Sequence, residues 1–260
     1  MSRVIAIANQ KGGVGKTTTS INLAAALAAT KRKILLFDLD PQGNATTGSG
    51  VHLEEDDANS YDVLIDEMPI SEMRHVINNQ DGTSYDVVAT NGDLTAAEVE
   101  LMNKLDRERQ LLYRLKAIKD EYDYILIDCP PSLSMLTINA MVAADSVLIP
   151  MQCEYYALEG LTALQNTIQS VQQTLNPELR IEGLLRTMYD PRNRLATEVS
   201  RQLVKFFGDK VYRSVIPRNV RLAEAPSHGV AIINYEKQSK GSKAYLALAG
   251  EIVRREEELL

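Results

Sequence analysis

A glycine-rich loop between an apolar run and a helical run constrains this chain more than any other feature. The segment GGVGKTT (12–18) closely follows the apolar run RVIAIA (3–8). Glycines let backbone N–H groups converge on phosphate oxygens, and the N-terminus of a following helix adds partial positive charge there. A strand, such a loop and a helix, in this order, form the context that a phosphate-binding loop requires. We therefore predict a P-loop nucleotide-binding protein.

The residues of this loop predict individual contacts with a magnesium nucleotide. Lys16 would contact the β- and γ-phosphates, the Thr17 hydroxyl would ligate Mg²⁺, and Thr18 would bond to the α-phosphate. The first glycine of the usual GxxxxGK[ST] pattern is missing from its place. The predicted nucleotide-binding residues of the loop are Lys11, Gly12, Gly13, Val14, Gly15, Lys16, Thr17 and Thr18.

Three carboxylates at the ends of apolar runs are predicted to complete the site. Asp128 ends YILID, which is the Walker B position, where a carboxylate supports the metal ion. Asp38 and Asp40 end the run KILLFDLD (33–40), and one of them could hold or polarise the attacking water. The predicted metal-site residues are Thr17, Asp40 and Asp128.

Short apolar runs alternate with helical stretches along nearly the whole chain. Continuous apolar strands separated by helices indicate a parallel sheet that is covered on both faces. We predict an α/β fold, a doubly wound, mostly parallel sheet with helices on both faces, as a single domain over residues 1–260, with 48–82 as an acidic, irregular surface insertion. The expected strands are 3–8, 33–40, 84–90, 122–131, 145–150, 180–188 and 211–217, and the expected helices are 15–30, 94–119, 133–143, 157–174, 195–207 and 240–257.

The charge of the chain is distributed unevenly along its length. Net charge is −7, but residues 186–255 hold 14 Lys and Arg against 6 Asp and Glu, a balance of +8, whereas the remainder carries −15. A basic C-terminal third on an acidic body could present one cationic face to an anionic partner. Two cysteines without a CxxC pair indicate a reducing cytosol, and the apolar runs are too short for a membrane span.

The segment NKLD (103–106) matches the pattern by which GTPases read guanine. It precedes the Walker B strand, whereas the guanine-reading segment of GTPases follows it. It also lies within a run that is predicted to be helical. We therefore interpret NKLD as part of a charged helix face and predict ATP as the nucleotide.

Four motifs resemble one family in particular. KGGVGKTT (11–18), DLDPQGNAT (38–46), DCPPS (128–132) and IPRNVRLAEAPSHG (216–229) closely resemble the ParA/Soj branch of the ParA/MinD class, the deviant Walker A P-loop ATPases. The resemblance extends from residue 3 to about residue 250. It implies a weak ATPase that uses ATP and Mg²⁺ in the partition of chromosomes or plasmids, with slow intrinsic hydrolysis because no arginine finger is evident.

The resemblance also implies roles for single residues. Lys16 would serve the chain's own nucleotide, while Lys11 would reach across a two-fold interface to the phosphates of a partner subunit. The catalytic residues would then be Lys11, Lys16 and Asp40, and Gly12 would lie where two subunits approach closely. The positions that match the adenine contacts of the family are Met188, Pro217 and Asn219.

The resemblance further implies DNA and protein partners. The ATP-bound homodimer of this branch binds double-stranded DNA without sequence preference, and the matching positions are Arg192 and Arg221. Arg194, Arg213, Arg218, Lys237, Lys240 and Lys243 could extend the surface. A ParB-type centromere-binding protein would stimulate hydrolysis by ordering segments near 38–46 and 128–134. We expect a cytoplasmic, nucleoid-associated protein with no N-terminal helix-turn-helix domain.

Three other classes share part of this pattern. A MinD-like membrane-cycling ATPase of division-site placement is the main alternative, but it needs a C-terminal helix that is basic on one side, and this chain ends EIVRREEELL. An iron–sulfur carrier would need paired interface cysteines, which the isolated Cys129 and Cys153 do not provide. A metabolic P-loop kinase would need an arginine-rich lid, and we find no such segment in the sequence.

Overall fold

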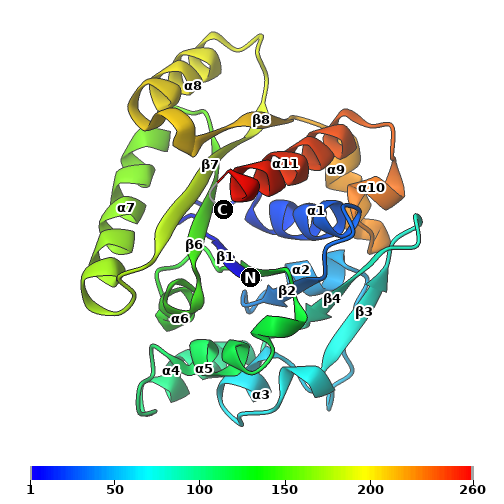
Figure 1. Cartoon of the computed structure of the whole chain (residues 1–260), viewed down its shortest axis with the longest axis vertical. Coiled ribbons are helices and arrows are strands. Elements are labelled where there is room, and N and C mark those ends of the chain that lie inside the picture. The colour runs from blue at the N-terminus through cyan, green and yellow to red at the C-terminus, as the bar shows by residue number, and fades with distance from the viewer. Residues whose placement is uncertain (1, 259–260) are drawn as a thin grey trace.

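The computed structural model describes residues 2–258, and within them eight strands form one sheet. Their bounds are β1 Arg3–Ile7, β2 Ile34–Asp38, β3 Arg74–Asn78, β4 Ser84–Val88, β5 Tyr124–Asp128, β6 Ser146–Gln152, β7 Arg180–Tyr189 and β8 Val211–Pro217. The spatial order is β3-β4-β2-β5-β1-β6-β7-β8 (Figure 1). The β3–β4 pair is antiparallel, and the other neighbouring pairs are parallel. The predicted doubly wound, mostly parallel sheet is confirmed.

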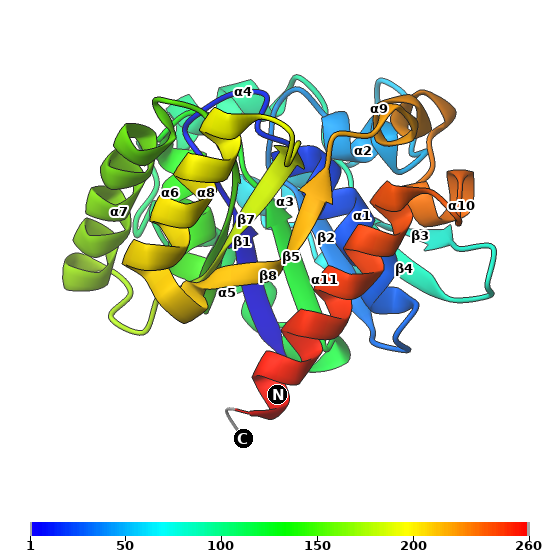
Figure 2. The same cartoon turned by 90° about the horizontal axis from the view of Figure 1, so that it is seen from above.

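Helices cover both faces of this sheet (Figures 1 and 2). Their bounds are α1 Lys16–Ala28, α2 Asn44–Gly48, α3 Ser60–Leu64, α4 Leu94–Leu101, α5 Gln110–Lys116, α6 Met135–Ala143, α7 Ala157–Thr174, α8 Arg194–Phe207, α9 Val220–Glu224, α10 Ile232–Tyr235 and α11 Lys240–Glu257. Single 3-10 turns occupy η1 Ile70–Glu72, η2 Lys119–Glu121, η3 Gly208–Lys210 and η4 Ala225–His228.

The apolar runs are continuous because both faces of each central strand are buried. In β1, Val4 and Ala6 pack into the core beneath α3 to α8, whereas Ile5 and Ile7 pack into the core beneath α1 and α11. Side chains of a strand alternate between the two faces, so a strand covered on both sides needs apolar residues at every position. The same alternation is found in β2 and β5.

Two expectations from the sequence are wrong. Residues 48–82 are not merely a surface insertion, because 74–78 form the edge strand β3 and Val63, Leu64 and Ile70 are buried in the core. The expected helix 94–119 is two helices, α4 and α5, with turns between them over 102–109. NKLD therefore lies in these turns and not within a helix. In the turns, the Lys104 ammonium donates to the Ile65 carbonyl at 2.6 Å.

The carboxyl ends of the central strands bring the predicted site together. Ile7 of β1 and Asp38 of β2 both pair with Asp128 of β5, so the three strands end at the same level. The loop after β1 and the first turn of α1 therefore lie beside the carboxylates that end β2 and β5. Over residues 2–258, no helix combines the length and the apolar character that crossing a bilayer demands.

Candidate nucleotide site

The loop between β1 and α1 leaves backbone donors free to meet an anion. Gly13 and Gly15 have φ of +71° and +84°, a left-handed conformation that favours glycine. Within residues 2–258, no protein acceptor is found for the N–H groups of Gly12, Gly13, Val14 and Gly15. A Cβ built on Gly12 or Gly13 would meet nothing within 4 Å. These open donors at a helix N-terminus fit the phosphates of a nucleotide.

Lys16, Thr17 and Asp128 form the centre of the site. Lys16 is the first residue of α1 and is only 7% exposed. Burial lowers the pKa of its ammonium, while the nearby Asp128 and Asp40 oppose this effect. The Thr17 hydroxyl donates to Asp128 at 2.7 Å. A hydroxyl and a carboxylate held together beside phosphate donors suit Mg²⁺, which prefers oxygen ligands.

Asp128 and Asp38 are completely buried and lie close together. Burial raises the pKa of Asp128 to about 6, although Ser20 and Thr17 donate hydrogen bonds to it. Burial and the charge of Asp128 raise the pKa of Asp38 to about 8. Two buried carboxyl groups with raised pKa values favour their neutral forms, and a divalent cation beside them would favour the ionised forms instead.

Asp38 and Asp40 have different surroundings. Asp38 accepts hydrogen bonds from the Thr46 N–H at 2.8 Å and the Thr46 hydroxyl at 2.7 Å, and so holds the segment 38–46 in place. Asp40 is 7% exposed, and its side chain accepts the Gln42 N–H at 3.1 Å. Asp40 therefore remains the better candidate for contact with water or metal, and Asp38 is the residue that shapes the loop.

Lys11 lies at the mouth of the site and not in it. Its ammonium is 2.5 Å from Glu154, and the side chains of the two residues are 42% and 55% exposed. Exposed ion pairs of this kind contribute about 0–1 kcal/mol, so little holds Lys11 in this position. Lys16 is therefore buried within the loop, whereas Lys11 is half-exposed beside it.

The predicted adenine contacts meet at the ends of β7 and β8. Met188 has φ of +48° and is 42% exposed, and its methyl carbon would lie 3.9 Å from a Cβ built on Gly15. Pro217 pairs with Tyr189 across the two strands. Asn219 uses its side-chain oxygen as the N-cap of α9, which leaves its NH₂ group for a ligand.

The two predicted DNA-contacting arginines lie beyond the same strand ends. The Arg192 side chain is 89% exposed and paired with Asp190 at 2.8 Å. Arg221 is 55% exposed and paired with Glu224 at 2.7 Å. Both residues follow the carboxyl ends of strands, the same side of the sheet on which the nucleotide loop lies.

The sequence analysis missed three residues that support the site. The Ser20 hydroxyl donates to Asp128 at 2.7 Å, and its position one helical turn after Thr17 was the signal that could have revealed it. Thr46 anchors Asp38, as described above. The Thr187 hydroxyl donates to the Val14 carbonyl at 2.7 Å and ties β7 to the loop. For Thr187 the sequence carries no such signal, because its partner Val14 is distant in the chain. Thr46 lies only eight positions after Asp38, but neither residue marks the turn that brings them together.

A phosphate loop after the first central strand of a parallel sheet, with carboxylates at the ends of the neighbouring strands, defines a P-loop nucleoside triphosphatase. Comparison with known proteins narrows this class. Residues 2–181 match a family model described as an AAA domain. The sporulation initiation inhibitor protein Soj of Bacillus subtilis is 52% identical over 97% of this chain and 98% of its own length.

One further relative carries a chromosome-partitioning name, and one solved structure shares the fold with a bound nucleotide. The chromosome partitioning protein ParA of Myxococcus xanthus is 51% identical over 98% of this chain and 89% of its own length. The crystal structure of a cobyrinic acid a,c-diamide synthase from Mycobacterium smegmatis, with a bound ATP analogue and magnesium, has a TM-score of 0.84 at 34% identity, covering 99% of this chain and 96% of that one. The chain belongs to the Soj/ParA family of chromosome-partitioning ATPases, hydrolyses ATP and uses Mg²⁺.

Proposed function

We propose that this partition ATPase works as an ATP-dependent homodimer. The observation that carries the proposal is the open side of the nucleotide loop: Lys11 is exposed there, and a Cβ on Gly12 or Gly13 would touch nothing in the same chain. Phosphates at this loop would bring more negative charge than Lys16 balances. A lysine from a second subunit would supply the missing cation, so the dimer would require ATP.

Sedimentation with a non-hydrolysable ATP analogue and Mg²⁺ tests this proposal. The wild-type protein is expected to sediment as a monomer without nucleotide and as a dimer with the analogue. Lys11→Ala is expected to stay monomeric while still binding the analogue through Lys16. A matched control is Lys31→Ala, which removes an exposed lysine far from the loop. An unchanged mass of the wild-type protein with the analogue would refute the proposal.

In the same proposal, the ATP-bound dimer binds double-stranded DNA without sequence preference through Arg192 and Arg221. Both arginines are exposed and held only by surface ion pairs, which phosphates can replace at low cost. Dimerisation would double this cationic footprint, and binding should weaken steeply with salt. Arg192→Glu and Arg221→Glu are each expected to reduce DNA retention while dimerisation persists, and Arg201→Glu on the outer side of α8 is the control.

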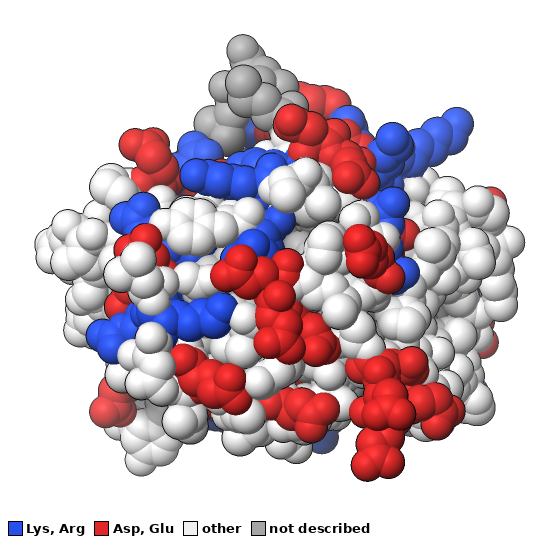
Figure 3. All heavy atoms as spheres, turned by 90° about the horizontal axis from the view of Figure 1, so that it is seen from below, with Lys and Arg blue, Asp and Glu red and all other residues white. Residues whose placement is uncertain are grey.

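We further propose that a ParB-type protein stimulates hydrolysis by binding the acidic body of the chain. Figure 3 shows clusters of Asp and Glu on the face seen from below in Figure 1, where α3, α4 and α5 lie. A hollow of about 480 Å³ in this region is lined by Glu55, Asp56, Asp57, Asp62 and Asp93. A short basic segment would suit this surface. Reversal of three of these charges should abolish stimulation and leave the unstimulated rate unchanged.

The structure gives the MinD-like alternative no free membrane helix within the described residues. The apolar face of α11 is already used, since Tyr245, Leu248 and Ile252 are buried against α1 and the sheet. Liposome flotation with ATP remains a direct test, and we expect no flotation.

A further inference from the structure

A hollow of about 780 Å³ lies near the amino-terminal ends of β1, β7 and β8, whereas the nucleotide loop lies at the carboxyl ends of the strands. The starts of β1 and β8, the part of β7 from Arg180 to Arg186, the 3-10 turn η3, Val204 of α8 and the end of α11 surround it. Parallel strands bring their amino-terminal ends to this side of the sheet, where Figure 2 places the end of α11 beside the start of the chain. The expectation of one cationic face is therefore wrong, because part of the basic C-terminal third lines this hollow and not the side of Arg192 and Arg221.

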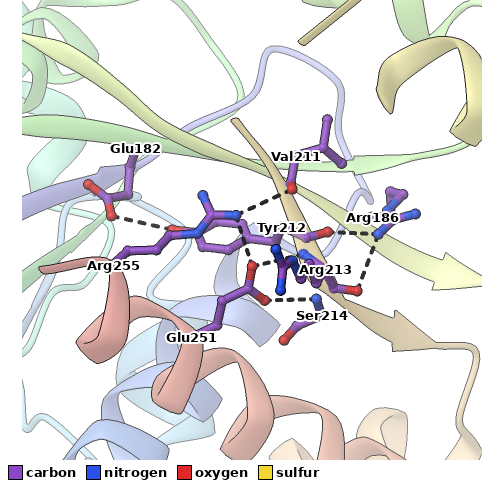
Figure 4. Close-up of polar contacts among 8 residues, drawn as sticks. All are labelled: Glu182, Arg186, Val211, Tyr212, Arg213, Ser214, Glu251 and Arg255. Atoms are coloured by element: carbon purple, nitrogen blue, oxygen red, sulfur yellow. Dashed lines mark hydrogen bonds and ion pairs between the residues drawn. The ribbon is translucent and has the colours of Figure 1, made fainter. Parts of the chain in front are cut away.

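Two buried carboxylates of the hollow, Glu182 and Glu251, are already neutralised, and Figure 4 shows the contacts of Glu251. Glu182 pairs with Arg3 and accepts the Ser146 hydroxyl at 2.7 Å. Glu251 pairs with Arg255 at 2.8 Å and also accepts two backbone N–H groups. Neither carboxylate is left to balance the other cations of the hollow.

Five cations of the hollow have no carboxylate partner. None of them takes part in the ion pairs found over residues 2–258. Among the residues that the structure describes, Asp209 and Glu258 are the remaining carboxylates that line the hollow, so this described lining has an excess of three positive charges. The five residues are Arg180, Arg186, Lys210, Arg213 and Arg254.

The floor of the hollow also contains unsatisfied donors. Arg3 Nη1 and Arg186 Nε are buried and have no hydrogen-bond partner among the described residues. The other nitrogens of Arg186 donate to neutral acceptors, the Ser200 hydroxyl at 2.9 Å and the Tyr212 carbonyl at 2.7 Å, which leave its charge uncompensated. Buried charge without a counter-ion is costly, so an anion that entered here would be stabilised.

We propose that this hollow is a second phosphate-binding site, separate from the nucleotide loop, for an anion that carries two or more adjacent phosphates. Guanidinium groups match phosphate oxygens in a planar, two-pronged geometry, and four of the five free cations are arginines. Cations that converge on a concave surface focus the field more strongly than the same charges spread over a convex one. A free polyphosphate and a stretch of nucleic-acid backbone share this chemistry.

Calorimetric titration with inorganic pyrophosphate tests the site while ADP keeps the nucleotide loop filled. Saturable binding is expected for the wild-type protein. The double variant Arg180→Glu, Arg213→Glu is expected to bind about tenfold more weakly or worse, because two charged contacts are reversed. The matched control Arg201→Glu, Lys116→Glu makes the same change of net charge outside the hollow and should bind within about twofold of wild type.

Circular dichroism and thermal unfolding confirm that each variant folds, and Arg180→Gln with Arg213→Gln replaces the reversed pair if it does not. The proposal is overturned if the ADP-filled wild-type protein binds no pyrophosphate, or if the control weakens binding as much as the hollow variant. Retention of duplex DNA by the hollow variant then shows whether the natural ligand is a nucleic acid or a small polyphosphate. If the hollow variant loses pyrophosphate and DNA alike, the ligand is a nucleic-acid backbone, and if it loses pyrophosphate alone, the ligand is a small polyphosphate.

Discussion

Arg186 and Glu251 hold the same segment of β8 from opposite faces of the sheet (Figure 4). Arg186 of β7 donates to the carbonyls of Tyr212 and Arg213, while Glu251 of α11 accepts the N–H groups of Arg213 and Ser214, each at 2.8 Å. The pairing here is irregular, since β7 advances from Leu184 to Arg186 while β8 advances from Val211 to Val215. The two side chains thus make hydrogen bonds with backbone groups of β8 where the β7–β8 pairing is irregular.

Loss of the Glu251 carboxylate should destabilise the chain in a pH-dependent way. Burial alone would raise the pKa of Glu251, but the Ser214 and Arg213 N–H groups outweigh it and hold the pKa below its usual value. Because the folded-state pKa is depressed, this stabilisation is present above the ordinary carboxyl pKa and is lost as pH falls through the folded value. Glu251→Gln should lower the free energy of unfolding by about 1–3 kcal/mol at neutral pH.

Urea unfolding at neutral pH and at a series of lower pH values measures this difference. The difference should shrink as pH falls through the folded-state pKa of Glu251, since the wild-type carboxyl becomes protonated there. Glu257→Gln, at an exposed position of the same helix, is the control and should change little at either pH. A loss of stability that is the same at both pH values would contradict the prediction.

Gly183→Ala in β7 should destabilise the fold through a steric conflict with the neighbouring strand β8. A Cβ at Gly183 would lie 2.6 Å from the ring of Tyr212, which is completely buried and cannot move aside. Overpacking of this kind costs about 1–3 kcal/mol. Gly160→Ala in α7, where a Cβ meets nothing within 4 Å, should instead be neutral or slightly stabilising. Equal melting temperatures for both variants would refute this account.

Gly12→Val should leave folding of the chain unchanged but prevent its dimerisation. Nothing in the same chain lies within 4 Å of a Cβ at Gly12, so the thermal midpoint without nucleotide should stay within about 2 °C of wild type. The branched side chain would occupy the space proposed for the second subunit, so sedimentation with ATP analogue should show only monomer. Gly92→Val, at another open glycine, should dimerise normally. Dimerisation of Gly12→Val would place the interface elsewhere.

Substitutions at Asp40 and Asp38 should have opposite signatures. Asp40→Ala should retain nucleotide binding and the thermal midpoint but lower the ATPase rate by about 10²-fold or more, as expected for loss of a group that positions or polarises water. Asp38→Ala leaves the Thr46 N–H without its acceptor and should lower the free energy of unfolding by about 1–3 kcal/mol. Phosphate release and thermal unfolding of both variants distinguish the roles, and full turnover by Asp40→Ala would exclude Asp40 from the chemistry.

Several of these features could be predicted from the sequence because their cause is local. The loop at 12–18 is recognisable since its glycines, its lysine and the adjoining strand and helix are consecutive. The central strands were found because burial on both faces requires continuous apolar runs. Helix α7 and helix α11 were predicted with the bounds that the structure shows, 157–174 and 240–257.

Other features depend on contacts between distant segments. Strand β3 has a polar, half-exposed sequence, and only pairing with β4 makes it a strand. Asp38 and Asp40 are two residues apart, a spacing that would place both on one face of a strand, but β2 ends at Asp38 and Thr46 then decides which carboxylate is anchored.

The sequence by itself determined that this protein binds a nucleotide and where its glycine-rich loop lies, because residue order within one short segment suffices for that. Only the tertiary structure decided how the charges are grouped. Parallel strands send their two ends to opposite sides of the fold, so Arg213, in the first half of β8, and Arg221, in α9 beyond the carboxyl end of that strand, belong to different charge groups although they are eight positions apart in the sequence.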